Sequence, residues 1–188
     1  LESTEENRKY MLKLPDLIKL NDYGGDWDKY LNVIYQIFVN DFIKTKPKFQ
    51  NQNLQLKRHP LFQDKEATFW HFITEGKSEE QRLPDMRRCE RIGWPRPIIE
   101  NSNDESIKIW ENTRKKETRI CLCYGNWEYL VVLSKRKNYI LPWTAYPITR
   151  SHAKNKIIRE YNKYIQQTKT APINGDGIVT PSTTWWMS

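Results

Sequence analysis

Histidines are the first residues of this 188-residue chain whose chemistry stands out. An imidazole titrates near neutral pH, so it can act as a general acid or base. His59 and His71 are the candidates for that role, whereas His152 lies at the start of a predicted helix and is expected on the surface. Each candidate also has a structural interpretation. His71 follows Trp70 and could be a packed core residue, and His59 precedes Pro60 and could cap the next helix.

Arginines and hydroxyl side chains could hold a phosphate beside such a histidine. The planar guanidinium group of arginine reaches two phosphate oxygens at once. Thr144 and Tyr146 alternate on a predicted strand and so face the same side, where they could hold the scissile phosphate. Arg91 is a further catalytic candidate beside the histidines, Thr144 and Tyr146. The candidates for contact with RNA are Arg87, Arg88, Lys135, Arg136, Lys137 and Arg150. The arginines at 87, 88 and 91 could instead pair with the neighbouring acidic residues, which are Glu79, Glu80, Asp85 and Glu90.

Cleavage of RNA needs no metal, because the 2′-hydroxyl of the substrate can attack the adjacent phosphate. The protein then supplies a base, an acid and cations that stabilise the charge developing on the phosphate. Cys121 and Cys123 have the wrong spacing for a zinc knuckle and are interpreted as core residues. Cys89 lies among arginines, which would lower the pKa of its thiol, but no thiol-enzyme motif surrounds it. The 7 glycines form no phosphate-binding loop. The sequence therefore predicts neither a metal nor a cofactor.

Positive charge is concentrated in one part of the chain. The formal net charge is +8, from 31 Lys and Arg against 23 Asp and Glu, and residues 107–170 hold 14 of the basic residues but only 4 of the acidic ones. A basic surface favours a polyanionic partner, because each contact between Lys or Arg and a phosphate releases a counterion. Tyrosines and tryptophans are interleaved with these charges and can stack on unpaired bases. The segment therefore favours RNA as the partner, with tRNA among the candidates.

Three helical segments are predicted before the basic segment. Apolar residues recur at helical spacing from Gly25 to about Lys44, with Asp26 as the N-cap. A short helix over residues 64–76 would end at Gly76 and place Phe62, Phe69 and Ile73 on one face. A second short helix over 84–92 would follow, in a region that holds Arg82 and the arginines named above. The sequence Trp94-Pro95-Arg96-Pro97 is expected to prevent any further helix.

An antiparallel meander is the strongest structural signal in the sequence. Three runs rich in β-branched and aromatic residues lie between 118 and 148, with tight connections at Gly125-Asn126 and at residues 135–138. Pro142 indicates that the last run is an edge strand or carries a bulge. Either Ile98-Ile99 or residues 107–110 could add a fourth strand. Ser151 then starts a helix that continues through Gln167.

These elements predict an α+β fold, in which N-terminal helices pack on a meander of three to four antiparallel strands and a C-terminal helix follows. The chain is divided into an N-terminal helical region, 1–57, a basic α+β domain, 58–170, and a C-terminal tail, 171–188. The mean hydropathy is −0.84 and no apolar run approaches the roughly 18 residues of a membrane span, so no membrane partner is expected. An odd number of cysteines and an acidic, polar start favour a reducing, cytoplasmic location.

The order of these elements resembles the barnase–EndoU–colicin–RelE class of small endoribonucleases, in its phage and toxin branches. The meander closes on Trp143-Thr144-Ala145-Tyr146-Pro147, and many members of the class have a hydroxyl residue, a small residue and an aromatic on the last strand. In that class an upstream helix contributes a histidine, and strand residues contribute Arg or Lys. The resemblance covers roughly residues 58–150 and implies a metal-independent ribonuclease, often a toxin held by an antitoxin or a component of phage conflict.

The function expected from the sequence is a cytoplasmic, toxin-like endoribonuclease that leaves a 2′,3′-cyclic phosphate, with His71 or His59 as acid or base. Its expected partners are RNA and an antitoxin or inhibitor protein. The alternative is a non-catalytic nucleic-acid-binding protein, a regulator or phage-conflict factor, that uses the same basic and aromatic surface without cutting. A third interpretation is a protein-interaction module that docks through Trp185-Trp186.

Overall fold

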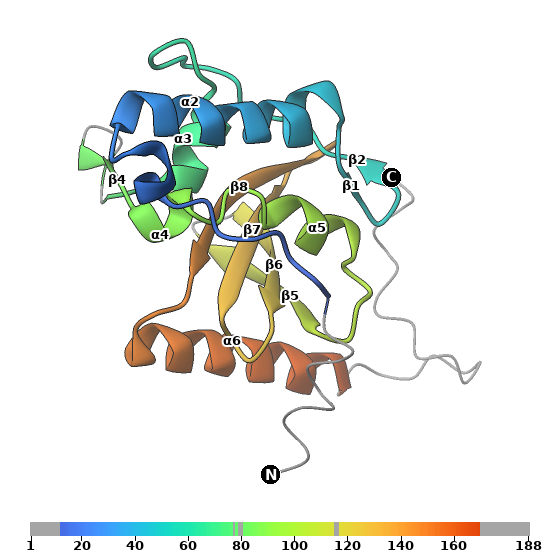
Figure 1. The fold of residues 1–188 in the computed structure, drawn as a ribbon. Helices are drawn as coiled ribbons and strands as arrows, with labels where there is room; N and C mark the ends of the chain where they lie inside the picture. Colours follow the sequence, from blue (N-terminus) through green and yellow to red (C-terminus); the bar gives the residue numbers. More distant parts are fainter. Residues whose placement is uncertain (1–11, 77, 79–80, 115–116, 170–188) are drawn as a thin grey trace.

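A four-stranded antiparallel sheet in the order β5-β6-β7-β8 organises the fold. The computed structural model describes residues 12–76, 78, 81–114 and 117–169. The strands are β5 (Ile107–Arg114), β6 (Glu117–Tyr124), β7 (Tyr129–Lys135) and β8 (Ile140–Pro147). Figure 1 shows α6 (Ser151–Lys169) along one side of the sheet and α2 (Trp27–Phe38) on the other. The predicted α+β class is confirmed. The strand added to the predicted three-stranded meander is β5, which includes residues 107–110.

Both faces of the sheet are buried, which follows from the alternation of side chains along each strand. On β6, Ile120 and Leu122 pack against the N-terminal helices, whereas Cys121 and Cys123 pack on the opposite face. That opposite face is covered by α6, through Ile157 and partly buried tyrosines. The cysteines of the Cys-Leu-Cys sequence are thus core residues, as predicted.

Strand β8 forms one edge of the sheet and contains a bulge. Val132 pairs with Thr144, but the next residue, Leu133, pairs with Pro142, so Trp143 is an extra residue on β8. Proline lacks the N–H group that an inner strand would need, and an edge position tolerates this loss. The prediction that Pro142 marks an edge or a bulge is confirmed.

The N-terminal helix α2 is capped and amphipathic, as predicted. The Asp26 side chain accepts a 3.1 Å hydrogen bond from the backbone N–H of Lys29, and Tyr30, Ile34 and Phe38 are fully buried in one core with the sheet. A π-helical segment, η2 (Val39–Lys44), continues α2 to the predicted end.

Three short helices connect α2 to the sheet, and they differ from expectation in several details, including a start at Met86 rather than Pro84 for the helix expected over 84–92. They are α3 (Ala67–Ile73), α4 (Met86–Cys89) and α5 (Pro95–Glu100), with a one-turn η1 (Leu20–Tyr23) before α2. Residues 95–100 were expected not to be helical, and Ile98-Ile99 was a candidate strand. Proline is nevertheless favourable in the first turn of a helix, where its missing N–H is not needed, so Pro95 starts α5. Phe62 does not share the buried face of Phe69 but is 60% exposed.

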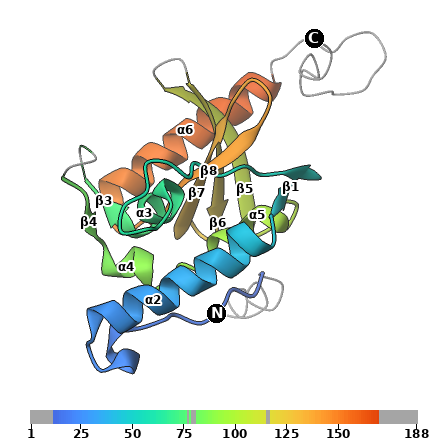
Figure 2. The same ribbon diagram turned by 90° about the horizontal axis from the view of Figure 1, so that it is seen from above.

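Two small hairpins complete the fold. One joins β1 (Lys48–Phe49) to β2 (Gln52–Asn53), and the other joins β3 (Thr74–Glu75) to β4 (Leu83–Pro84). Helix α3 ends one residue before Thr74 and not at Gly76. Gly76 is needed for a close approach, since a Cβ atom there would lie 2.7 Å from the carbonyl oxygen of Gln81. Figure 2 shows α3 beside β8.

Helix α6 starts at the predicted residue and ends two residues beyond the predicted Gln167. None of the helices in the described ranges is long and apolar enough to cross a membrane. The tail at 171–188, including Trp185-Trp186, lies outside the described residues, as do residues 1–11 and the acidic pair Glu79-Glu80.

Candidate active site

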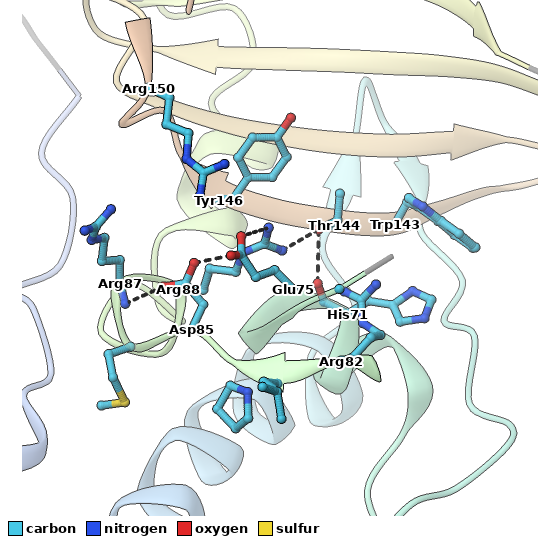
Figure 3. A pocket seen from close by; sticks show the side chains of 14 residues that line it. His71, Glu75, Arg82, Asp85, Arg87, Arg88, Trp143, Thr144, Tyr146 and Arg150 are labelled. Carbon is cyan, nitrogen blue, oxygen red and sulfur yellow. Dashed lines mark hydrogen bonds and ion pairs between the residues drawn. The ribbon is translucent and has the colours of Figure 1, made fainter. Parts of the chain in front are cut away.

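A pocket of about 970 Å³ lies at the β8 edge of the sheet. Its walls come from β8, the end of α3, the β3–β4 hairpin and the start of α4, as Figure 3 shows. Six of the residues selected from the sequence line it: His71, Arg87, Arg88, Thr144, Tyr146 and Arg150. They come from parts of the chain far apart in sequence, so the pocket is created by the tertiary fold.

Thr144 links the edge strand to α3. Its Oγ1 donates a 3.0 Å hydrogen bond to the backbone carbonyl of His71. The same oxygen lies 3.3 Å from Nη1 of Arg88, which also donates to the carbonyl of Thr74 at 2.9 Å. One hydroxyl therefore joins three elements, β8, α3 and α4.

The His71 ring lies in the wall of the pocket beside the bulged residue of β8. Its centroid is 4.9 Å from that of Trp143, in an edge-to-face arrangement. The residue is only 4% exposed, yet it lines this pocket and a second, neighbouring one. In Figure 3 the imidazole lies on the Trp143 side of the pocket, and Arg87 and Arg150 lie on the opposite side.

Arg88 is a fixed positive charge at the centre of the site. Its guanidinium group lies 3.6 Å from the Glu75 carboxylate and 3.5 Å from that of Asp85. It also lies over the Tyr146 ring, 5.0 Å from the centroid. The side chain is 11% exposed, so these contacts hold a charge that would be costly to bury alone. Of the acidic neighbours suggested by the sequence, the structure describes Asp85, which pairs with Arg88, and Glu90, which pairs with Arg91.

Three further arginines surround this centre. Arg82 donates from Nε to Oγ1 of Thr74 at 2.9 Å and from Nη2 to the Thr74 carbonyl at 2.8 Å. Arg87 is exposed and donates to Oγ1 of Thr149 at 3.2 Å. Arg150 is exposed, and its guanidinium group has no hydrogen bond or ion pair with any residue that the structure describes. Among the residues that the structure describes, the pocket thus presents four arginines against two carboxylates, which favours an anionic ligand.

Tyr146 contacts Arg88 through its ring rather than through its hydroxyl. Thr144 and Tyr146 both line the pocket, as their alternation predicted, but in Figure 3 the hydroxyl of Tyr146 points away from Thr144 and His71. Burial raises the pKa of Tyr146, so the group is a neutral phenol at physiological pH. Its face supports the Arg88 guanidinium group.

The other residues selected from the sequence lie outside this pocket. His59 is exposed on the loop before α3. Arg91 donates to the Arg87 carbonyl, pairs with Glu90 at 3.2 Å and lies over the ring of Trp94. The basic turn lies at the opposite end of the β7–β8 hairpin from Tyr146, because Lys135 pairs with Ile140. There Lys135 pairs with Glu111, Arg136 pairs with Glu117, and Lys137 is exposed.

Sequence reasoning did not select three charged residues of the pocket: Glu75, Arg82 and Asp85. Asp85 caps α4 by accepting from the backbone N–H of Arg87 at 2.9 Å, a role that its position before a predicted helix could have indicated. Arg82 was recognised as part of an arginine-rich region but not as a site residue. No local signal distinguishes Glu75, whose position depends on the β3–β4 hairpin.

Cysteine and metal chemistry find no support in the described residues. Arginines near Cys89 were expected to lower the pKa of its thiol, but burial outweighs them and raises this pKa to about 12. Burial likewise raises the pKa values of Cys121 and Cys123 to about 12. Within the described ranges, no group of three or more His, Cys, Asp or Glu residues could hold a metal ion.

Comparison with known proteins finds no family model, no curated protein and no solved structure that matches this chain. The interpretation of the pocket therefore depends on its own geometry and chemistry.

Proposed function

We propose that this chain is a metal-independent endoribonuclease of toxin type. The observation that supports the proposal is that one pocket joins an imidazole, His71, to four arginines. An imidazole can transfer a proton near neutral pH, and guanidinium groups stabilise charge on a phosphate. Neither step needs a metal ion.

The reaction is an internal transfer of the phosphate within the substrate. The 2′-hydroxyl of RNA loses its proton to a base as its oxygen bonds to phosphorus, and the bond from phosphorus to the 5′-oxygen breaks as that oxygen gains a proton. The products end in a 2′,3′-cyclic phosphate and a 5′-hydroxyl. We assign one of the two proton transfers to His71, and the stabilisation of the phosphate oxygens to Arg88 with the exposed Arg87 and Arg150. His59, which lies outside the pocket, has no part in this assignment.

Helix α6 begins beside this pocket and carries a basic surface toward β5, since Lys163 lines a separate pocket with residues of that strand. Lys156, Arg159 and Lys163 are all exposed, and their spacing places them on one face of the helix. None of the three has an ion pair with a residue that the structure describes. Because α6 begins one residue after Arg150, RNA held at the pocket could continue along this face. The proposal includes tRNA as a candidate substrate, an antitoxin or inhibitor protein as a partner, and action in the cytoplasm.

A second candidate function is binding of nucleic acid without cleavage. It is favoured by the 4% exposure of His71 and by the carbonyl of that residue acting as an acceptor for Thr144. In this interpretation His71 is a packed residue that positions β8, and the arginines hold the phosphate.

The test is incubation of the purified chain with total tRNA and with a generic single-stranded RNA in the presence of EDTA. Wild type is compared with His71→Asn and with two matched controls, His59→Asn and His152→Asn, since both of these histidines are exposed. Circular dichroism checks that each variant folds, and a filter-binding assay measures RNA binding. We expect discrete fragments that end in 2′,3′-cyclic phosphate from wild type and from both controls, and none from His71→Asn.

Two results would contradict the proposal. Intact RNA in the wild-type lane, together with measurable RNA binding, would favour the second candidate function. Cleavage that persists in a folded His71→Asn variant would remove His71 from the mechanism.

A further inference from the structure

A second pocket, of about 570 Å³, adjoins the arginine-lined one. Its volume is within the range of about 300–1,000 Å³ that small-molecule sites occupy. Its walls are mainly apolar and aromatic, and they include Trp27, Phe62 and Trp70.

The two pockets share part of their lining. His71, Arg82 and Pro84 border both of them. A ligand with an anionic group among the arginines could therefore place an attached flat, apolar group in the second pocket. A nucleotide combines these two features.

Phe62 and Trp70 form an aromatic wall in which the two rings contact each other and the ring of Phe62 stays exposed. The rings of Phe62 and Trp70 are 5.1 Å apart between centroids and inclined by 69°. Nε1 of Trp70 donates a 2.9 Å hydrogen bond to the Phe62 carbonyl, which fixes the loop against α3. Phe62 is nevertheless 60% exposed, so its face is accessible to a planar ligand. Stacking of bases on aromatic side chains tolerates any base, because every base has a π-face.

We propose that this second pocket binds an unpaired base of the RNA, the one adjoining the phosphate held at the arginines. The inference rests on the proposed function and gives it a substrate class, single-stranded or looped RNA. A base within a duplex would first have to leave its stack, at a cost of a few kcal/mol. Lys57, at the same wall, supplies a further positive charge for the adjoining backbone.

The occupant is a base rather than an apolar peptide because of the charge around the pocket. Among the described residues, its polar lining includes Lys57 and Arg82 and no acidic side chain, and four arginines line the adjoining pocket. The phosphate next to a base would be attracted by this positive charge, whereas a purely apolar segment carries no group that it attracts.

The probe for this site is a short single strand of 2′-O-methyl RNA, which cannot be cleaved because it lacks the attacking hydroxyl. Binding is measured by fluorescence anisotropy for wild type and Phe62→Ala. The matched control is Leu61→Ala, since Leu61 is an adjacent residue that is also 50% exposed but does not line the pocket. Two further probes of the same length are a strand of abasic residues and a fully paired duplex.

We expect Phe62→Ala to weaken binding of the single strand by roughly 5- to 100-fold, the range found when a base-stacking aromatic is removed. Leu61→Ala should leave it unchanged, and neither variant should alter binding of the abasic strand or the duplex. Equal effects of the two variants, or equal effects on the abasic strand, would overturn the base-binding assignment. Because the probe is not cleavable, this result is independent of catalysis. Intact RNA in the cleavage assay with a selective Phe62→Ala effect would reject the nuclease proposal and retain the base site.

Discussion

The side-chain hydroxyl of Thr144 donates a hydrogen bond to the backbone carbonyl of His71, 3.0 Å away and 73 positions earlier in the chain. The last carbonyl groups of a helix have no partner within the helix, and α3 ends at Ile73. Thr144 therefore satisfies one of these terminal carbonyl groups. The bond also fixes the distance between the edge strand and the histidine of the pocket.

Replacing Thr144 by valine tests this link. Valine keeps the branched shape but removes the hydroxyl that donates to the His71 carbonyl and accepts from Nη1 of Arg88, so we expect a loss of about 1–2 kcal/mol in the free energy of unfolding. The cleavage rate should fall by about tenfold or more, because misplacement of a catalytic group has a large effect on rate. Thr144→Ser, which keeps the hydroxyl, is the control. Urea unfolding and the kcat of RNA cleavage measure the two effects, and a valine variant that matches wild type in both would contradict the interpretation.

Tyr146 should be replaceable by phenylalanine but not by leucine. Phenylalanine keeps the ring under Arg88 and loses only a hydroxyl that points away from the pocket, so we expect cleavage within about twofold of wild type. Leucine removes the cation–π contact, worth about 0.5–2 kcal/mol, and should lower kcat/KM several-fold. Because the pKa of Tyr146 is raised, the wild-type and phenylalanine enzymes should have the same rate profile up to pH 9. A phenylalanine variant as impaired as leucine would show that the hydroxyl takes part.

The basic face of α6 should determine how strongly salt weakens RNA binding. Replacing Lys156, Arg159 and Lys163 together by glutamine should reduce the slope of log K against log salt by about 2, since each contact with a single strand adds about 0.7. The apparent KM should rise while kcat stays unchanged, because these residues do not line the pocket.

The matched control for this variant replaces three exposed lysines of the N-terminal region, Lys13, Lys44 and Lys46, by glutamine. It makes the same change in net charge on a different surface. Titrations with non-cleavable RNA at several salt concentrations measure both slopes. Equal slopes for the two triple variants would indicate that net charge, rather than the α6 face, attracts the RNA.

Asp41 should make the stability of the fold depend on pH. Burial raises the pKa of this carboxyl group to about 6, against an ordinary value of 3.8. Between those values the folded state binds more protons than the unfolded state, so the contribution of Asp41 to stability falls as the pH rises through this window and is least favourable above it. Asp41→Asn should therefore match wild type near pH 4 and be more stable at pH 7, by on the order of 1 kcal/mol, since water at a half-buried site offsets part of the effect.

Urea unfolding of wild type and Asp41→Asn at four pH values between 4 and 7 measures this difference. The difference in the free energy of unfolding should grow with pH and level off above about pH 6. A difference that is constant over the whole range would mean that the substitution acts through packing or hydrogen bonding and not through the proton.

Local patterns were sufficient to determine most elements of this fold. The spacing of apolar residues in α2, the alternation in the meander and the polar face of α6 each reflect burial of one side of a regular element. Pro142 could be placed at an edge or a bulge because proline lacks a backbone donor. Proline was misleading at Pro95, where the same missing donor is compatible with a helix start. One chemical property thus favours opposite outcomes, depending on where the helix begins.

The composition of the pocket was decided by the tertiary structure. Sequence alone selected His71, Thr144 and the arginines by their chemistry, but it could not separate His71 from His59 or the arginines at 87 and 88 from Arg136. Those distinctions depend on α3 packing beside the edge strand β8. They also depend on the basic turn lying at the other end of the β7–β8 hairpin from Tyr146. The direction of the Tyr146 hydroxyl likewise could not be predicted from the local sequence. Alternation along a strand determines on which face of the sheet a side chain lies, whereas the surrounding packing determines the position of its polar atom.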